Sequence, residues 1–443
     1  MSQAENKADL LVTGNYLYMQ DRDKTVIEHG AVAIHKDTIV DTGVAVDLAQ
    51  KYPDVELLSM EHGLIMPGLV NTHTHAAMAC FRGLADDLPL MQWLKEYILP
   101  VEAKLTGDMI YQATLLSLAE MIKSGTTSFC DTYLFAKDVA RATEKSGMRA
   151  WIGEVLYDFP SPNYGEVASG FQYVEELFAL YNNHPLISIT VDPHAVYTCS
   201  PPLLKKLKSM AEKHDALYII HLSENEKEVK GSKEQHGASP VMHLENLGLL
   251  DSRVIADHCV MLTDAEIEIL AKKEVKIAHC PESNMKLASG IAPVPRMLAA
   301  NISVGLGTDG SASNNDVDMF GEMNSAAKLH KVNTLNPTAL PADTVLKMAT
   351  MGGARVLDAE NEIGSLEPGK KADLIVLDMN QPHLTPLFSL PSHIVYAARG
   401  ADVVHSVING EVVMQDRKLK TLDEKTILDD IMNMGKQIIK MKG

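Results

Sequence analysis

Two histidines at a spacing of two, His73 and His75, end the stretch that begins at Met66. If this stretch is a β-strand, side chains two positions apart point to the same face of the sheet. Both imidazoles then project from one strand end, where together they suit a single ion of zinc, iron, nickel or copper. A His-x-His pair also occurs by chance on exposed loops, so a metal site requires further ligands from elsewhere in the chain.

Ligand-type side chains also follow several later apolar runs. His221 ends one run and is followed three residues later by Glu224. His258 ends the next run, Asp309 follows the last, and His194 follows an earlier one. A single such residue is typical of an ordinary structural side chain, and most of the 17 histidines have no link to this site. Because several separate apolar runs each end in a ligand-type residue, we interpret these residues as parts of one metal site.

The elements that would position these residues alternate along the middle of the chain. Stretches with helical spacing, such as 109–122, 201–214 and 264–273, lie between short apolar runs, and Ser200 and Thr263 are expected N-caps of the last two. Strands that alternate with helices predict parallel βαβ units, and eight of them predict an α/β fold with a closed (β/α)8 TIM-like barrel. Catalytic groups of such barrels lie at the C-terminal strand ends. The expected strands are 65–71, 126–130, 150–156, 186–191, 217–222, 254–257, 275–279 and 302–306.

Both ends of the chain are β-rich. Short runs separated by Gly, Asp and Asn occur over 9–60, and similar runs return after the barrel region. Asn409-Gly410 predicts a hairpin turn between the last two runs, and a helix is expected over 426–441. We therefore expect one small β-sandwich built from residues 1–66 and 365–443, with residues 67–364 inserted as the barrel.

Composition restricts the classes of function. A chain of 443 residues, 46% of them hydrophobic, can form a large core. The formal net charge of −18 argues against nucleic acid or an anionic membrane surface as a partner, and no apolar run approaches the roughly 20 residues of a membrane helix. Five scattered cysteines fit a reducing compartment, and the polar N-terminus does not resemble a signal peptide. We expect a soluble cytoplasmic protein with a small-molecule substrate; the oligomeric state is open, a homo-oligomer included.

Four motifs carry a resemblance to a known family: PGLVNTHTH at 67–75, HLSE at 221–224, HC at 258–259 and GTDG at 307–310. They resemble the amidohydrolase superfamily, in its branch of metal-dependent purine and pyrimidine aminohydrolases. Within that branch the chain is most similar to the 5′-methylthioadenosine/S-adenosylhomocysteine deaminases, and the resemblance covers nearly its whole length. Triazine hydrolases and other purine or pterin deaminases share many of these residues, so a triazine, guanine or a pterin is the alternative substrate. The further similar stretches are 81–87, 99–102, 279–287 and 310–315.

The resemblance implies a role for each polar residue. Glu224 would transfer a proton, His258 would hold the attacking water, and Asp309 would accept a proton from that water. Glu102 would bind the ribose hydroxyls, and His194 would be a further substrate contact. Judged by the residues alone, Glu102 is also typical of a solvated charge and His194 of a buried structural histidine. The implied metal ligands, all present in this chain, are His73, His75, His221 and Asp309.

The resemblance also bears on the metal and its chemistry. Binuclear members of the superfamily use a lysine or glutamate at the end of the fourth strand, and 187–194 offers neither. We therefore expect one ion, which would be zinc, although the ligand types also allow iron or manganese. Three histidines and one aspartate leave a position for a water, whose pKa falls from about 15.7 to about 7 on a metal. That nucleophile, with Glu224 as proton carrier, would replace the amino group of an adenine nucleoside, release ammonia and leave an inosine-type product.

The 5′-substituent of the substrate is the part that the sequence does not explain. Trp93 lies in an apolar stretch that could wall a pocket for a thioether tail or simply pack in the core. Arg82, Arg149 and Arg296 are available to bind the charged amino-acid tail of S-adenosylhomocysteine, and nothing in the sequence selects one of them. The preference among methylthioadenosine, S-adenosylhomocysteine and adenosine is therefore open.

Overall fold

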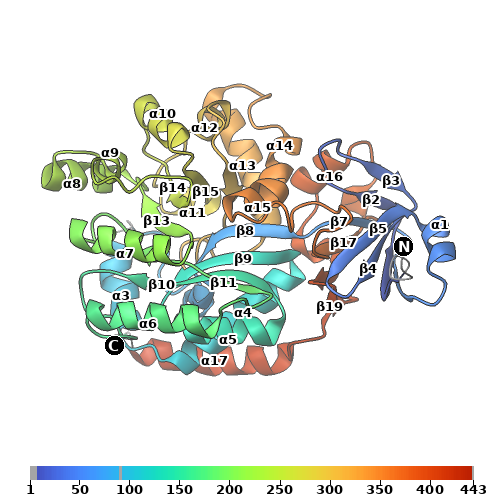
Figure 1. Ribbon diagram of the computed structural model, residues 1–443, viewed down its shortest axis with the longest axis horizontal. Helices are drawn as coiled ribbons and strands as arrows, with labels where there is room; N and C mark the ends of the chain where they lie inside the picture. The colour runs from blue at the N-terminus through green and yellow to red at the C-terminus, as the bar shows by residue number, and fades with distance from the viewer. Residues whose placement is uncertain (1–6, 89–91, 442–443) are drawn as a thin grey trace.

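The computed structural model describes residues 7–88 and 92–441 (Figure 1). Its centre is a barrel of parallel strands in two sheets, with the orders β8-β9-β10-β11 and β13-β14-β15-β16, and with β12 beside β10. A parallel bridge between Val191 and Tyr218 joins the sheets on one side. On the other side Thr72 Oγ1 donates to the Leu306 carbonyl at 2.9 Å. The strands are β8 (Leu69–Thr74), β9 (Thr126–Tyr133), β10 (Arg149–Leu156), β11 (Ile187–Ile189), β12 (Asp192–Pro193), β13 (Tyr218–Leu222), β14 (Val254–His258), β15 (Lys276–His279) and β16 (Val304–Leu306).

Helices cover the outside of the barrel (Figure 1). α10 (Asp264–Lys272) begins at Thr263, which forms a capping box with Glu266. α7 (Pro201–Lys213) has Ser200 as its N-cap residue, as predicted, although the Ser200 side chain makes no capping hydrogen bond. The two prolines that open this helix carry no N–H, so fewer donors in the first turn require a partner. The other α-helices between residues 107 and 356 are α4 (Gly107–Lys123), α5 (Ala136–Ser146), α6 (Val167–Leu180), α8 (Glu226–His236), α9 (Pro240–Asn246), α11 (Pro281–Lys286), α12 (Val294–Ala299), α13 (Met319–Thr334), α14 (Ala342–Lys347) and α15 (Gly353–Val356).

The first strand expected for the barrel is in fact two strands in two different sheets. β7 (Gly63–Pro67) lies in the sandwich, and β8 begins the barrel. Gly68 separates them, and its amide still donates to the Asp373 carbonyl of the sandwich at 3.1 Å. A Cβ atom at Gly68 would lie 2.0 Å from Thr127 Oγ1. Glycine allows this close approach to the neighbouring strand, so the chain changes sheets here and the prediction of one continuous strand is wrong.

Both ends of the chain form the sandwich, which lies at the right of Figure 1. Apolar side chains from its two sheets, including Val12, Ile65 and Val376, form one buried cluster. The predicted hairpin turn at Asn409-Gly410 joins β18 to β19, with φ values of +52° and +81°. The fold class expected from the sequence is confirmed, and we propose residues 67–364 as the limits of the barrel. The sheets have the orders β5-β4-β1-β6 and β20-β19-β18-β17-β7-β2-β3. Their strands are β1 (Leu10–Thr13), β2 (Tyr16–Tyr18), β3 (Val26–Glu28), β4 (Gly30–His35), β5 (Thr38–Val44), β6 (Glu56–Ser59), β17 (Leu374–Asp378), β18 (Val403–Ile408), β19 (Glu411–Gln415) and β20 (Lys418–Leu419).

Further helices lie outside the barrel layer. α1 (Ala45–Lys51) packs on β4 and β5, and α16 (Leu390–Tyr396) packs on α13 and α14. α17 (Glu424–Met441) packs on α4 and runs along the lower edge of the molecule in Figure 1. Within the described part of the chain, no helix combines the length and the apolar character needed to cross a membrane.

Candidate active site

Three histidines from two barrel strands converge at the C-terminal end of the barrel. His73 lies in β8 and His75 directly follows this strand, while His221 lies in β13. Their ligand nitrogens lie within 4.8 Å of one another, and His75 Nε2 is 3.3 Å from His221 Nε2. The structure therefore brings the His-x-His pair together with His221, which lies 146 residues after His75 in the sequence.

The hydrogen bonds of these histidines fit a bound cation. His75 Nδ1 lies 2.6 Å from the Thr132 carbonyl, and His221 Nδ1 lies 2.8 Å from the His194 carbonyl. A carbonyl only accepts, so each Nδ1 carries the proton and each Nε2 has a lone pair. Two lone pairs 3.3 Å apart repel each other, whereas a cation between them would be bound by both. The two carbonyls, on the far side of each ring, hold the rings in the orientation that this requires. The buried Nε2 of His73 likewise has no hydrogen-bond partner among the described residues.

Asp309 joins the group from the loop after β16. Its Oδ1 lies 3.3 Å from His75 Nε2 and 3.7 Å from His73 Nε2. Burial raises the pKa of Asp309, but the neighbouring His75, His258 and His73 outweigh burial and hold this pKa below its usual range. Behind His73, Asp257 Oδ2 lies 3.1 Å from Nδ1, and a carboxylate in this position orients a ligand ring. Asp257 was not predicted, although it directly precedes His258 in the sequence.

Burial favours the neutral form of His75, His194 and His221. Burial lowers the pKa of His75 to about 4 and the pKa of His194 to about 4. Burial and the neighbouring histidines lower the pKa of His221 well below its usual value. Neutral imidazole is the form that binds a metal, so the burial of His75 and His221 favours the state that a metal site requires.

Glu224 and His258 lie beside this group. Both line a small cavity of about 70 Å³, which also contacts His221 and Asp309. Burial raises the pKa of Glu224, so its carboxyl group holds a proton more readily than an exposed glutamate does. Burial opposes the charge of His258, but Glu224 and Asp309 outweigh it and raise the pKa of His258. The small cavity therefore holds two groups able to exchange protons next to the three histidines and Asp309.

The short helix α11 positions two of these groups. Ser283 Oγ donates to Asp309 Oδ2 at 2.6 Å, and Asn284 Oδ1 lies 3.0 Å from His258 Nδ1. Sequence reasoning gave neither residue a role. Their location within the stretch 279–287, one of those that carry the family resemblance, was the available signal.

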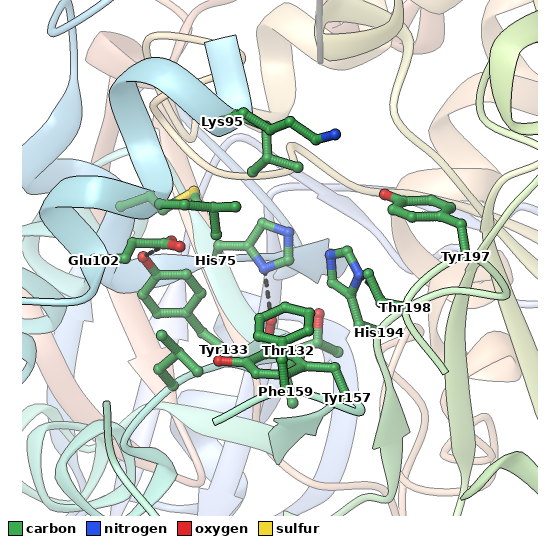
Figure 2. Close-up of a pocket in the computed structure, with 15 residues that line it drawn as sticks. His75, Lys95, Glu102, Thr132, Tyr133, Tyr157, Phe159, His194, Tyr197 and Thr198 are labelled. Carbon is green, nitrogen blue, oxygen red and sulfur yellow. Dashed lines mark hydrogen bonds between the residues drawn. The ribbon is translucent and has the colours of Figure 1, made fainter. Parts of the chain in front are cut away.

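A larger cavity of about 410 Å³ adjoins the small one. Its volume lies in the range of small-molecule sites, roughly 300–1,000 Å³. Figure 2 shows Glu102 and Tyr133 together on one side of it, His194 on the other side and His75 between them. Trp93, in η2 (Trp93–Ile98), lines the small cavity beside the metal-ligand group. The residues that line both cavities are His75, Met78, Leu94, His194 and Tyr197.

Glu102 is a buried group of the larger cavity and not a solvated charge. It ends α3 (Leu99–Glu102), and Tyr133 at the end of β9 donates its hydroxyl to Glu102 Oε1. Burial raises the pKa of Glu102 to about 7, and the Tyr133 hydrogen bond opposes part of this rise. His194 is also held in place, because its Nδ1 lies 2.8 Å from Thr198 Oγ1. The structure therefore brings Glu102 and His194 into one cavity; Tyr133 is a partner that the sequence did not indicate.

Comparison with known proteins gives similarity along nearly the whole chain. Residues 64–413 match the amidohydrolase family. A 5-methylthioadenosine/S-adenosylhomocysteine deaminase of Syntrophobacter fumaroxidans is 51% identical over 433 residues, which cover 98% of this chain and 99% of that protein. A 5′-deoxyadenosine deaminase of Methanosarcina barkeri is 44% identical over 434 residues, which cover 98% of this chain and 99% of that protein.

A solved structure is similar over the same length. The crystal structure of an adenosine deaminase from Xanthomonas campestris with bound zinc has a TM-score of 0.95 and 37% sequence identity. The match covers 98% of this chain and 99% of that chain. The similarity therefore extends over both the barrel and the sandwich.

Proposed function

The chain belongs to the amidohydrolase family, and from this premise we propose that it is a metal-dependent hydrolytic deaminase of adenine nucleosides. Its substrates carry a 5′-thioether or a related 5′-group, as the names of its two curated relatives suggest. The reaction releases ammonia and leaves an inosine-type product. The single observation that carries this proposal is the convergence of His73, His75, His221 and Asp309 next to the small cavity that Glu224 lines.

We assign His73, His75, His221 and Asp309 as ligands of one divalent ion, with zinc favoured by the zinc-bound structural neighbour. The two opposed Nε2 lone pairs of His75 and His221 support this assignment. When bound, such an ion lowers the pKa of a water from about 15.7 to about 7 and so supplies a nucleophile at neutral pH. The protein's own contribution is to orient these ligands. His75 and His221 are held by the Thr132 and His194 carbonyls, and Asp309 is held by the Ser283 hydroxyl.

Glu224, His258 and Asp309 carry the proton transfers in this proposal. The Glu224 carboxyl, whose pKa is raised by burial, delivers a proton to the ring nitrogen beside the carbon that loses its amino group. His258 orients the attacking water while Asn284 holds its Nδ1. Asp309 accepts a proton from that water and passes it to the amino group, which leaves as ammonia while Glu224 takes up the proton of the new hydroxyl group. Positioned acid–base groups of this kind contribute roughly 10²–10⁴ in rate.

The two cavities divide the substrate between them. The heterocycle occupies the small cavity beside Glu224, and the sugar occupies the larger cavity, where Glu102 accepts hydrogen bonds from the ribose hydroxyls and His194 makes a further contact. Trp93 contacts the heterocycle, since it lines the small cavity. A triazine, free guanine or a pterin has no sugar to fill the larger cavity, which is why we favour a nucleoside.

Deamination changes the ultraviolet absorbance of the purine ring, which allows a direct test. Zinc-loaded protein should deaminate 5′-methylthioadenosine or 5′-deoxyadenosine, and metal-stripped protein should not. Glu224→Gln should keep its zinc content and lose activity by at least ~100-fold, because an amide cannot donate and take back a proton as a carboxyl group does. Ammonia release from guanine, a pterin or a triazine, without release from any adenine nucleoside, would show that the substrate class is wrong. Near-normal turnover by Glu224→Gln would remove Glu224 from proton transfer.

A further inference from the structure

None of the three arginines that the sequence offered for a charged substrate tail lines the larger cavity. Arg82 pairs with Glu120 and lines a separate groove beside α4. Arg149 is buried against Asp373, with Nε 2.7 Å from Oδ2, where barrel and sandwich meet. The third, Arg296 in α12, pairs with exposed Asp264 at the start of α10.

The wall of the larger cavity is instead aromatic and aliphatic. Tyr157 and Phe159 follow β10 and stack with ring centroids 3.9 Å apart at an interplanar angle of 16°. Tyr157 is buried, whereas Phe159 is 41% exposed and offers an uncovered apolar surface at this wall. Leu134 and Val155 also line the cavity. An exposed aromatic ring at a cavity wall gains free energy when an apolar group of a ligand covers it.

Among the described residues that line this cavity, Lys95 is the only lysine or arginine. Lys95 lies on η2, on the side of the cavity opposite Tyr157 and Phe159 (Figure 2). It is exposed to solvent. Among the described lining residues, Glu102 is the one acidic group, and it accepts a hydrogen bond from Tyr133. The aromatic wall therefore has no partner for a carboxylate, because Lys95 lies across the cavity from it. Glu102, which we assign to the ribose, is not available to an ammonium group.

From this lining we infer that the enzyme selects adenine nucleosides with a small uncharged 5′-group, such as methylthio or hydrogen, over S-adenosylhomocysteine. The inference rests on the proposed function and makes the Tyr157–Phe159 pair its specificity-determining element. A methylthio group covers the Phe159 ring, and because it is uncharged, no charged group loses its hydration when it binds. The amino-acid tail of S-adenosylhomocysteine carries an ammonium and a carboxylate, and burying such charges without partners is strongly unfavourable.

The first test is a comparison of kcat/KM for four nucleosides with zinc-loaded enzyme: 5′-methylthioadenosine, 5′-deoxyadenosine, adenosine and S-adenosylhomocysteine. We expect kcat/KM for S-adenosylhomocysteine to be at least ~10-fold lower than kcat/KM for 5′-methylthioadenosine, since a tenfold change requires only a small difference in binding free energy. Equal values for these two substrates would overturn the inference and leave the proposed function standing. Absence of ammonia release from all four would overturn the proposed function itself.

Substitutions at Phe159 test the cause of the selectivity. Phe159→Arg should raise kcat/KM for S-adenosylhomocysteine and lower it for 5′-methylthioadenosine, so that their ratio falls roughly 10-fold or more. Phe159→Leu keeps an apolar surface and should keep the preference. Phe388→Arg is the matched control, because Phe388 is 89% exposed and does not line the cavity. An unchanged ratio in Phe159→Arg would remove this wall from substrate selection.

Discussion

The hydrogen bond from Tyr133 to Glu102 shows how one buried residue changes the pKa of another. The Tyr133 hydroxyl occupies one carboxylate oxygen of Glu102 and leaves the other for a ligand. Burial raises the pKa of Glu102 to about 7, and the hydroxyl limits that rise because it stabilises the carboxylate form. In the proposed function, Tyr133 is therefore a positioning residue for the group that holds the ribose.

Replacing Tyr133 with Phe should weaken nucleoside binding and change its pH dependence. Hydrogen bonds to charged groups contribute about 1.5–3 kcal/mol, so KM for a nucleoside should rise roughly 10-fold. Without the hydroxyl the pKa of Glu102 lies higher, and its carboxylate form is reached only at higher pH. The acid limb of kcat/KM should therefore move to higher pH.

The control for this change is Tyr164→Phe, because the Tyr164 hydroxyl donates to the Val155 carbonyl at 3.2 Å and does not touch Glu102. It should leave the acid limb in place. If Tyr133→Phe shifts neither KM nor the acid limb, then Tyr133 does not position Glu102.

At the scale of secondary structure, the short turn at Gly68 determines where the metal ligands lie. β7 belongs to the sandwich and β8 to the barrel, and β8 carries His73. Thr127 of β9 contacts the Cα side of Gly68 so closely that a Cβ atom would lie 2.0 Å from Thr127 Oγ1. The packing of the Thr127 side chain on the Gly68 backbone therefore fixes the position of β8 at its beginning.

Gly68→Ala should destabilise the protein and weaken the metal site. Overpacking in a well-packed interior costs about 1–3 kcal/mol, and relief of the clash requires β8 to move together with His73. Thermal unfolding and zinc content should both fall. Thr127→Ala in the same chain should restore part of the loss, because it removes two of the three contacting atoms.

Gly231→Ala provides the comparison, since a Cβ atom at Gly231 in α8 meets nothing within 4 Å. Alanine also favours a helix, so this change should leave stability unchanged or slightly raised. Equal stability and zinc content for Gly68→Ala and the parent protein would show that β8 tolerates displacement at its start.

At the scale of the whole molecule, a buried ion pair connects the two domains. Arg149 begins β10 of the barrel, and its Nε donates to Asp373 Oδ2 at 2.7 Å just before β17 of the sandwich. Asn409 of the hairpin turn donates its amide to Asp373 Oδ1 at 2.7 Å. Arg149 is 5% exposed and Asp373 is 3% exposed. Removal of one partner would leave an uncompensated charge in the interior between the domains.

Arg149→Ala should therefore lower the free energy of unfolding by about 3–5 kcal/mol. The matched change Arg296→Ala breaks the exposed pair with Asp264 and should cost less than about 1 kcal/mol. Thermal or denaturant unfolding of both variants provides the measurement. Similar losses for the two variants would mean that the Arg149–Asp373 pair does not stabilise the contact between barrel and sandwich.

The sequence by itself determined the features that depend on local preferences and on periodicity. Alternating strands and helices indicated the barrel, Asn409-Gly410 indicated the hairpin, and Thr263 indicated a helix start. These features follow from side-chain spacing, turn conformation and capping within a few residues. The ligand-type residues were also identified, because in a barrel every strand end can be inspected at the same relative position.

Only the tertiary structure decided the contacts that depend on which strands become neighbours and in what register. Three features are of this kind: one apolar run divides at Gly68, Asp257 lies against His73, and Tyr133 pairs with Glu102. Each involves segments that lie far apart in the sequence or belong to different sheets. The engagement of Arg149 at the domain contact is of the same kind. Such contacts arise from closure of the barrel and from its packing against the sandwich. Both bring side chains together whose local sequence carries no information about their partners.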